Sequence, residues 1–205
     1  MVAEVSRGGS QIEQATDPFV LFDDWFESAK RSELNDPNAM ALATATPDGK
    51  PSVRIVLMKR RDARGFSFFT NGESRKGEEL RHNSQVALCF HWKSRQRQIR
   101  VEGTVSELPA AEVDEYFSQR HRMSQIGAWA SQQSRPLASR EELIALTREY
   151  EKKFPDDVPR PPYWTGFVVK PDVMEFWQEC EYRLHDRFTF TANPDGTWSR
   201  QRLNP

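Results

Sequence analysis

Five short segments of the sequence carry side chains that could bind a charged or polar ligand. In residues 53–59, the cations Arg54 and Lys59 stand at the two ends of an apolar, strand-like run. A buried cation needs a partner, so these two either bind an anion or lie at a rim where their stems let the charges reach water. Strict alternation points them to opposite faces. One site could therefore use both only if the strand bends; otherwise they serve two ligands.

Three further segments give weaker signals. Residues 71–77 place cations and a serine at an expected helix start, which can hold a phosphate but more often faces water. Residues 96–101 put amides and a guanidinium on one strand face, which could contact a polar heterocycle or water. Residues 116–134 suit an anion pocket or an ordinary amphipathic helix pair. The side chains concerned are Ser74, Arg75, Lys76, Gln96, Gln98, Arg100, Tyr116, Arg120, Arg122, Ser124, Gln125, Trp129, Gln133 and Ser134. Taken singly, each segment favours the structural interpretation.

The fifth segment, residues 183–187, is the most informative. A strand here would place Arg183, His185 and Arg187 on one face. Like charges on one face are unfavourable unless an anion or polar ligand lies among them, so the pattern favours a binding role. His185 could donate or accept a hydrogen bond near neutral pH. The sequence has neither an HExxH nor a GxSxG motif, and nothing in it supports a Ser–His–Asp triad.

The composition limits what these segments can do. The chain has 205 residues and a formal net charge of -1, so no global positive field attracts nucleic acid or anionic lipid, and any anion site must be local. The two cysteines, Cys89 and Cys180, lie outside any CxxC pair, which argues against a zinc site or a disulfide framework and makes a reducing cytoplasm the simplest location. We expect no metal, no signal peptide and no membrane-spanning segment.

The elements that must position these side chains follow from patterning. Residues 1–16 are mostly polar and predict a flexible leader, and residues 17–205 predict a single domain. Asp17 and Pro18 predict the cap and first turn of a helix. Further helices are expected at 74–82, 109–121, 124–131 and 139–154, and strands at 39–46, 52–59, 66–70, 86–92, 96–108, 166–169, 173–177, 184–191 and 198–202. This order predicts a mainly β, α+β chain, an antiparallel barrel with helical insertions.

Taken together, seven stretches resemble the pyridoxine/pyridoxamine 5'-phosphate oxidase family of FMN-binding split barrels. The stretches are 54–59, 69–71 with 74–76, 97–98, 124–129, 133–134, 175–178 and 183–187. Each is weak alone, but the set in family order is specific and spans roughly residues 17–205. The resemblance implies an antiparallel FMN-binding split β-barrel, and a homodimer with two FMN sites at the subunit interface.

The resemblance also implies a role for each matching residue. FMN would be bound, in part from the second subunit, by Arg54, Ile55, Val56, Leu57, Met58, Lys59, Phe69, Thr70, Arg75, Lys76, Gln98, Gln133, Ser134, Trp177 and Arg187. The substrate would be bound by Lys59, Tyr116, Arg120, Ser124, Arg183, Leu184 and His185. Arg183 and His185 would be the catalytic residues, orienting and polarising the pyridine ring. FMN and substrate each bring a phosphate, which accounts for cations at both ends of residues 54–59.

The implied reaction converts pyridoxine 5'-phosphate or pyridoxamine 5'-phosphate to pyridoxal 5'-phosphate, with hydride transfer to FMN and reduction of O2 to H2O2. The chain departs from the family pattern twice. Its leader lacks an Arg-Arg-x-Tyr-like segment, and residues 179–182 read Glu-Cys-Glu-Tyr where many members have small residues. Two alternatives remain: a split-barrel flavin reductase with another substrate, and a noncatalytic carrier of FMN or pyridoxal phosphate. Nucleic-acid binding is the least expected function.

Overall fold

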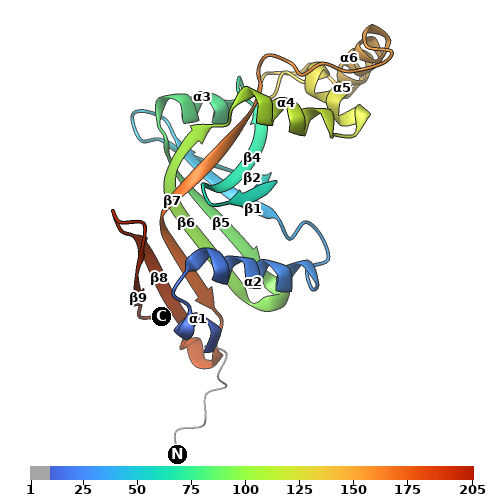
Figure 1. Ribbon diagram of the computed structural model, residues 1–205. Coiled ribbons are helices and arrows are strands. Elements are labelled where there is room, and N and C mark those ends of the chain that lie inside the picture. The colour runs from blue at the N-terminus through green and yellow to red at the C-terminus, as the bar shows by residue number, and fades with distance from the viewer. Residues whose placement is uncertain (1–9) are drawn as a thin grey trace, which may run out of the picture.

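The computed structural model describes residues 10–205, and within them nine strands form one antiparallel sheet (Figure 1). The strands are β1 (Ala39–Ala45), β2 (Pro51–Leu57), β3 (Arg60–Asp62), β4 (Gly65–Asn71), β5 (Gln85–Trp92), β6 (Arg97–Glu107), β7 (Trp164–Gln178), β8 (Asp186–Ala192) and β9 (Trp198–Arg202). The helices are α1 (Ser10–Gln14), α2 (Pro18–Lys30), α3 (Arg75–His82), α4 (Ala110–Ser118), α5 (Arg122–Ala130) and α6 (Arg140–Lys153), with 3-10 turns η1 (Lys93–Arg95) and η2 (Glu181–Arg183). The predicted mainly β architecture with helical insertions is confirmed.

Strand β7 pairs with three other strands and so connects the two parts of the sheet. The strand order is β2-β1-β5-β6-β7-β4-β3, and β8, which also pairs with β9, joins β7 as well. The first half of β7 pairs with β4 and the second half with β8, so the sheet divides near Pro171. At this point the register with β6 shifts between Glu102 and Gly103. A Cβ on Gly103 would lie 2.0 Å from the Lys170 carbonyl oxygen, so a glycine is needed where the strands approach.

The main apolar core lies between the sheet and α2. Asp17 caps this helix by accepting the Phe19 N–H at 2.7 Å, and Pro18 occupies the first turn, as the sequence predicts. The helix then buries Phe22 and Trp25, which are 0% and 1% exposed, against the strands. A second, smaller core holds α4 and α5 against the start of β7. These two cores fix helices at opposite ends of the sheet, as Figure 1 shows.

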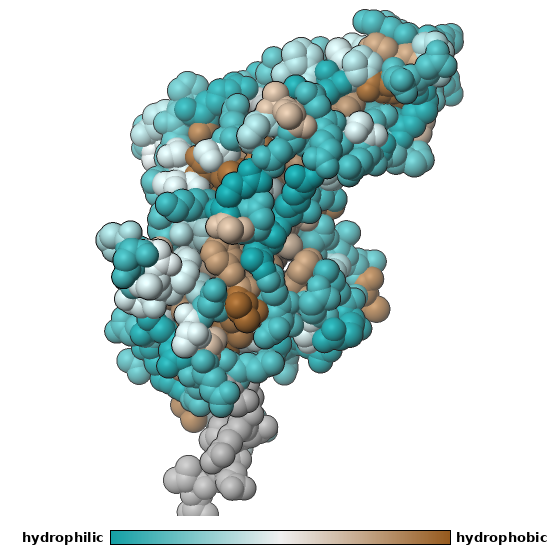
Figure 2. All heavy atoms as spheres, viewed as in Figure 1, coloured by the Kyte–Doolittle hydropathy of each residue, from teal (hydrophilic) through white to brown (hydrophobic). Residues whose placement is uncertain are grey.

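The face of the molecule seen in Figure 2 is mainly polar, with smaller apolar patches between the hydrophilic side chains. Among the described residues, no helix is both long enough and apolar enough to cross a membrane.

Two predicted strands are in fact one. The expected strands 166–169 and 173–177 are parts of the continuous strand β7. The expected gap contains Pro171, which cannot donate to a ladder. In the structure Pro171 lies at the register shift with β6, where a proline is tolerated, so it marks an irregularity within β7.

The starts of β8 and β6 also differ from prediction. The expected strand 184–191 begins only at Asp186, because the preceding residues form η2, in which Tyr182 and Arg183 have positive φ angles of 57° and 65°. Strand β6 begins after Gln96, which has a φ of 53°.

Part of the expected leader is structured. Ser10–Gln14 form α1, and Ile12 is buried in the main core. The remainder of that expectation, residues 1–9, lies outside the described residues.

Candidate functional site

One large open cleft, with a volume of about 1030 Å³, lies beside β2, β4 and the helices α3, α4 and α5. Its lining residues are Ser52, Val53, Arg54, Ile55, Val56, Leu57, Lys59, Phe69, Thr70, Asn71, Arg75, Lys76, Tyr116, Arg120, His121, Ser124, Gly127, Ala128, Ser131, Gln133, Ser134 and Trp164. The flavin hypothesis requires Arg54, Lys76 and Ser134 to lie near one another, and all three line this cleft. The fold therefore brings together in one cleft most of the predicted site residues, which lie far apart in the sequence.

The bend that Arg54 and Lys59 need in order to share a site is present. After β2 ends, the Met58 backbone N–H donates to the Asn38 carbonyl oxygen at 2.9 Å, and the Lys59 backbone N–H donates to the Ser67 carbonyl oxygen at 2.8 Å. The chain thus moves from the β1 side to the β4 side, which interrupts the alternation of side chains. Met58 does not line this cleft, because its side chain turns into the core and is 4% exposed, and its assignment to FMN stays a prediction.

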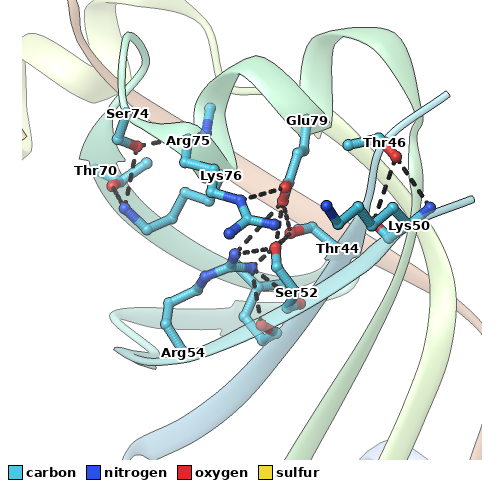
Figure 3. A network of polar contacts seen from close by, with 12 residues as sticks. Thr44, Thr46, Lys50, Ser52, Arg54, Thr70, Ser74, Arg75, Lys76 and Glu79 are labelled. Carbon is cyan, nitrogen blue, oxygen red and sulfur yellow. Dashed lines mark hydrogen bonds and ion pairs between the residues drawn. The ribbon is translucent and has the colours of Figure 1, made fainter. Parts of the chain in front are cut away.

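Charged side chains around α3 form a network that we call the α3 cluster (Figure 3). Hydrogen bonds and ion pairs link Thr44, Ser52, Arg54, Arg75 and Glu79, and we count Lys76 with them because its charge lies close to that of Arg54. The Glu79 carboxylate, 4% exposed, accepts hydrogen bonds from the hydroxyls of Thr44 and Ser52 through Oε2. Its Oε1 accepts the Nε–H of Arg75 at 2.9 Å. Nη2 of Arg54 lies 3.4 Å from Oε2, and the guanidinium also donates to both hydroxyls.

Hydrogen bonding keeps the Glu79 carboxylate ionised. Burial alone would raise its pKa, but hydrogen bonds from Ser52, Thr44 and Arg75, together with the charge of Arg75, lower the pKa to about 2. The three cations of the α3 cluster therefore face a single negative charge, which leaves a net charge of about +2, similar in size to that of a phosphate monoester dianion.

Lys76 adds a buried positive charge. Its three donor hydrogens have three acceptors: Thr70 Oγ1 at 3.0 Å, Ser74 Oγ at 3.1 Å and Gln133 Oε1 at 2.6 Å. Burial and the neighbouring charge of Arg54 lower the pKa of Lys76 to about 8. Lys76 thus provides charge in the cleft wall and holds Gln133 in place.

A second set of polar groups, the α4–α5 cluster, consists of Lys59, Tyr116, Arg120, His121 and Ser124. The Arg120 guanidinium lies over the Trp164 ring at 5.0 Å, and burial lowers the pKa of Arg120. Within residues 10–205, Nη1 of Arg120 is buried without a hydrogen-bond partner. The Tyr116 ring stacks on Phe69 at 4.0 Å. A buried guanidinium donor left unpaired in a cleft suits an anionic ligand.

The remaining predicted site residues lie elsewhere in the chain, in a set that we call the β7–β8 group. Its members are Gln98, Trp177, Arg183, Leu184, His185 and Arg187, and none of them lines the cleft of its own chain. Gln98, Trp177 and Arg187 stand directly opposite one another on β6, β7 and β8, so they share a face. The His185 ring lies 4.7 Å from that of Trp177, and its Nδ1 accepts the Cys180 N–H at 3.2 Å.

The strand pattern inferred for residues 183–187 is wrong. Arg183 belongs to η2, and Leu184 and His185 precede β8, so alternation cannot place Arg183 and His185 on one face with Arg187. A similar correction applies to Gln96 and Arg100. Gln96 lies outside β6, and Arg100 pairs with Glu102 and Glu175, so the expected polar face reduces to Gln98.

Several cleft residues were given no individual binding role from the sequence, although most lie in the segments singled out above. They are Ser52, Val53, Asn71, His121, Gly127, Ala128, Ser131 and Trp164. Glu79, behind the cleft wall, was also missed, although its position four residues after Arg75 is the spacing of an ion pair on one helix face.

The fold and the cleft define the class: the chain is a split-barrel protein. A solved pyridoxamine 5'-phosphate oxidase-related, FMN-binding protein from Nostoc punctiforme PCC 73102 shares this fold, with a TM-score of 0.75 at 15% identity over 94% of this chain and 100% of that chain. The solved structure of PhzG from Burkholderia lata 383, in complex with tetrahydrophenazine-1-carboxylic acid, has a TM-score of 0.88 at 32% identity over 94% of both chains.

Sequence comparison narrows the class to one family. The model described as pyridoxamine 5'-phosphate oxidase matches residues 26–154, and that of the pyridoxine 5'-phosphate oxidase C-terminal dimerisation region matches residues 164–205. A curated pyridoxine/pyridoxamine 5'-phosphate oxidase from Brucella abortus (strain 2308) is 50% identical over 204 residues, 98% of each protein. The chain belongs to the pyridoxine/pyridoxamine 5'-phosphate oxidase family and is an oxidoreductase; the predicted family is confirmed.

Proposed function

We propose that this chain binds FMN and oxidises pyridoxine 5'-phosphate or pyridoxamine 5'-phosphate to pyridoxal 5'-phosphate, with O2 reduced to H2O2. The observation that carries this proposal is one cleft with two sets of cations, the α3 cluster and the α4–α5 cluster. A flavin nucleotide and a phosphorylated pyridine each bring one phosphate, so a cleft that holds both needs two such sets. Family membership supports the same reaction.

The donor set around α3 fits the phosphate of FMN. Arg75 uses its Nε on Glu79, and its side chain is 57% exposed, so its Nη groups are free to approach a ligand. Lys76 contributes a buried charge, and Gln133 and Ser134 border the same cleft. When bound, FMN would accept hydride from the substrate and pass the electrons to O2.

The α4–α5 cluster fits the phosphate of the substrate. Lys59 and the unpaired Nη1 of Arg120 are its cations, and Ser124 lies in the first turn of α5, where backbone N–H groups favour anions. Tyr116, stacked on Phe69, offers a flat wall for a pyridine ring. These groups would bind and orient the substrate while leaving the redox chemistry to the flavin.

We further propose that the active form is a cytoplasmic homodimer. The dimerisation-region match supports it, as do Val53 and Ile55, which are 67% and 66% exposed on β2 and would be covered by a partner or a flavin. In such a dimer the partner's β7–β8 group would complete the cleft, with Arg183 and His185 over the pyridine ring. Both cysteines of the chain are free thiols, which suits a reducing compartment.

The test is anaerobic mixing of the FMN-loaded protein with pyridoxine 5'-phosphate. The flavin absorbance should bleach and return on admission of air, with pyridoxal 5'-phosphate and H2O2 formed in equal amounts. Pyridoxine without the phosphate is the matched control, and it should bleach the flavin far more slowly because it cannot use Arg120. Protein that takes up no FMN, or whose bound flavin is not reduced by either phosphorylated substrate, would contradict the proposal.

A further inference from the structure

Glu79 does not line the cleft, yet its carboxylate occupies the centre of the α3 cluster. It is 4% exposed, and its partners come from three elements: Thr44 from β1, Ser52 and Arg54 from β2, and Arg75 from α3 (Figure 3). Burying a carboxylate costs several kcal/mol before its partners repay it, and an apolar side chain often serves stability as well. A buried charge at this position therefore suggests a task other than stability.

The contacts of the two carboxylate oxygens indicate a role in holding the neighbouring arginines. Each Glu79 oxygen holds one guanidinium that borders the cleft: Oε1 accepts Arg75 Nε at 2.9 Å, and Oε2 lies 3.4 Å from Arg54 Nη2. Arg75 is a long, largely exposed side chain with many rotamers, and Glu79 restricts it to those that face the cleft.

We propose that Glu79 is a positioning residue for phosphate: it fixes Arg54 and Arg75 at the cleft wall and thereby gives the cleft its preference for a phosphorylated flavin over the same flavin without phosphate. This inference rests on the proposed FMN site and adds to it a residue that the ligand does not touch. The competing explanation is that Glu79 only holds α3 against the sheet. Loss of such a structural contact would weaken the binding of FMN and riboflavin equally, whereas loss of a positioning residue would weaken only the binding of FMN.

The discriminating variant is Glu79→Gln. The glutamine oxygen can still accept from Ser52 or Thr44, but its amide group then faces the Nε–H of Arg75, so two donors meet and the guanidinium must move away. We expect the dissociation constant of FMN to rise about 10- to 100-fold, as for a lost charge-assisted hydrogen bond. The dissociation constant of riboflavin should stay within about threefold of the wild-type value, because riboflavin has no phosphate for Arg54 and Arg75 to bind.

The matched control is Glu78→Gln, which removes the same charge from the neighbouring position of the same helix. Glu78 pairs with Arg135 at 2.5 Å on the surface, with 46% of its side chain exposed, and it does not line the cleft. Its FMN affinity should stay within about threefold of wild type, since exposed pairs contribute little.

Three results would overturn the inference while leaving the FMN site intact: E79Q that binds FMN as wild type does, E79Q that binds FMN more tightly, and equal losses for FMN and riboflavin. If E79Q does not fold, Arg75→Met replaces it, because that exposed side chain can be removed without opening the core. R75M should show the same selective loss of FMN affinity, and unchanged selectivity would contradict the role of Glu79.

Failure of the proposed function has a different signature, since wild-type protein would then bind no FMN at all. In that case inorganic phosphate is the probe. It should raise the thermal unfolding temperature of wild type and E78Q but not of E79Q. Equal stabilisation of all three proteins would overturn the inference on its own.

Discussion

The α3 cluster and the β7–β8 group differ in how completely one chain builds them. In the α3 cluster, Glu79 is held by four partners and Lys76 has an acceptor for each of its hydrogens. In the β7–β8 group, Leu184 is 56% exposed, and Arg183 and the adjacent Tyr182 both take a left-handed backbone conformation that costs energy. Folding of one chain therefore completes the first region, whereas Arg183 and Leu184 of the second remain exposed.

This difference suggests that the two regions serve different steps of ligand binding. The proposed phosphate recognition would be preorganised within one chain, because ion pairs hold Arg54 and Arg75 and hydrogen bonds hold Lys76 before any ligand arrives. Recognition of the pyridine ring is expected to wait for assembly, because the groups proposed for it line no cleft in their own chain. Variants of the two regions should therefore fail in different ways.

The largest effect is expected for Lys76→Met. It removes a buried charge and leaves Thr70, Ser74 and Gln133 without their shared donor. The FMN dissociation constant should rise by about 100-fold or more, equivalent to about 3 kcal/mol, as for one member of a buried charged pair. Fluorescence titration of FMN measures it. Lys50→Met, a loss of the same charge from an exposed turn outside the cleft, is the control and should leave the affinity within about twofold.

Arg120→Met should separate the two phosphate sites. The KM for pyridoxine 5'-phosphate should rise about 10- to 100-fold, because a charge-assisted hydrogen bond to the phosphate is lost. The affinity for FMN should stay within about threefold, since Arg120 belongs to the α4–α5 cluster. Steady-state kinetics and FMN titration together check this, and a parallel loss of both affinities would mean that the cleft has only one anion site.

The pH dependence of FMN binding should show the deprotonation of Lys76. Its pKa is lowered to about 8 in the free protein, and a bound phosphate dianion would raise it again. Below pH 8 the lysine is already protonated, so Lys76 adds no pH dependence there. Above pH 8 binding must take up a proton, so the dissociation constant should increase with pH, by at most about tenfold per unit. Titrations from pH 7 to about 9.5 measure the slope; K76M should abolish it, and a slope retained in K76M would assign it to another group.

The smallest effect in this series is a change in stability at the β7–β8 group. Glu175 is 7% exposed and bonded by both Arg187, at 2.8 Å, and Arg100, at 3.0 Å. Arg187→Met and Arg100→Met should each lower the free energy of unfolding by only about 1 kcal/mol, because the other arginine remains and both are partly exposed. Only R187M should also slow flavin reduction, since Arg187 lies directly opposite Trp177, whereas Arg100 lies opposite Glu175. Equal rates in both variants would make Arg187 purely structural.

Local signals in the sequence predicted most of the fold. Asp17, Ser74 and Ser139 were expected at helix starts, and each caps its helix by accepting a backbone N–H. The segments that line the cleft were also found, because polar groups and cations interrupt otherwise apolar strands. Such signals need no knowledge of tertiary structure.

What the sequence could not supply depends on contacts between distant segments. Residues 166–169 and 173–177 were expected as two strands, and only their common pairing with β6 across a register shift makes them one. Glu79 looked like one acid in a charged helix, and only the approach of β1 and β2 buries it among hydroxyls and cations. The strand expected at residues 183–187 failed because η2 delays β8 to Asp186.

The most direct test of the division between the two regions uses hybrid dimers. One chain carries Lys76→Met, which disables its cleft, and the other carries Arg183→Met with His185→Gln, which disables its β7–β8 group; each homodimer should be nearly inactive. If each cleft is completed by the partner, random mixing after unfolding and refolding gives hybrids with one working site, and about a quarter of wild-type activity should return. Activity no greater than the sum of the two inactive parents would contradict the account.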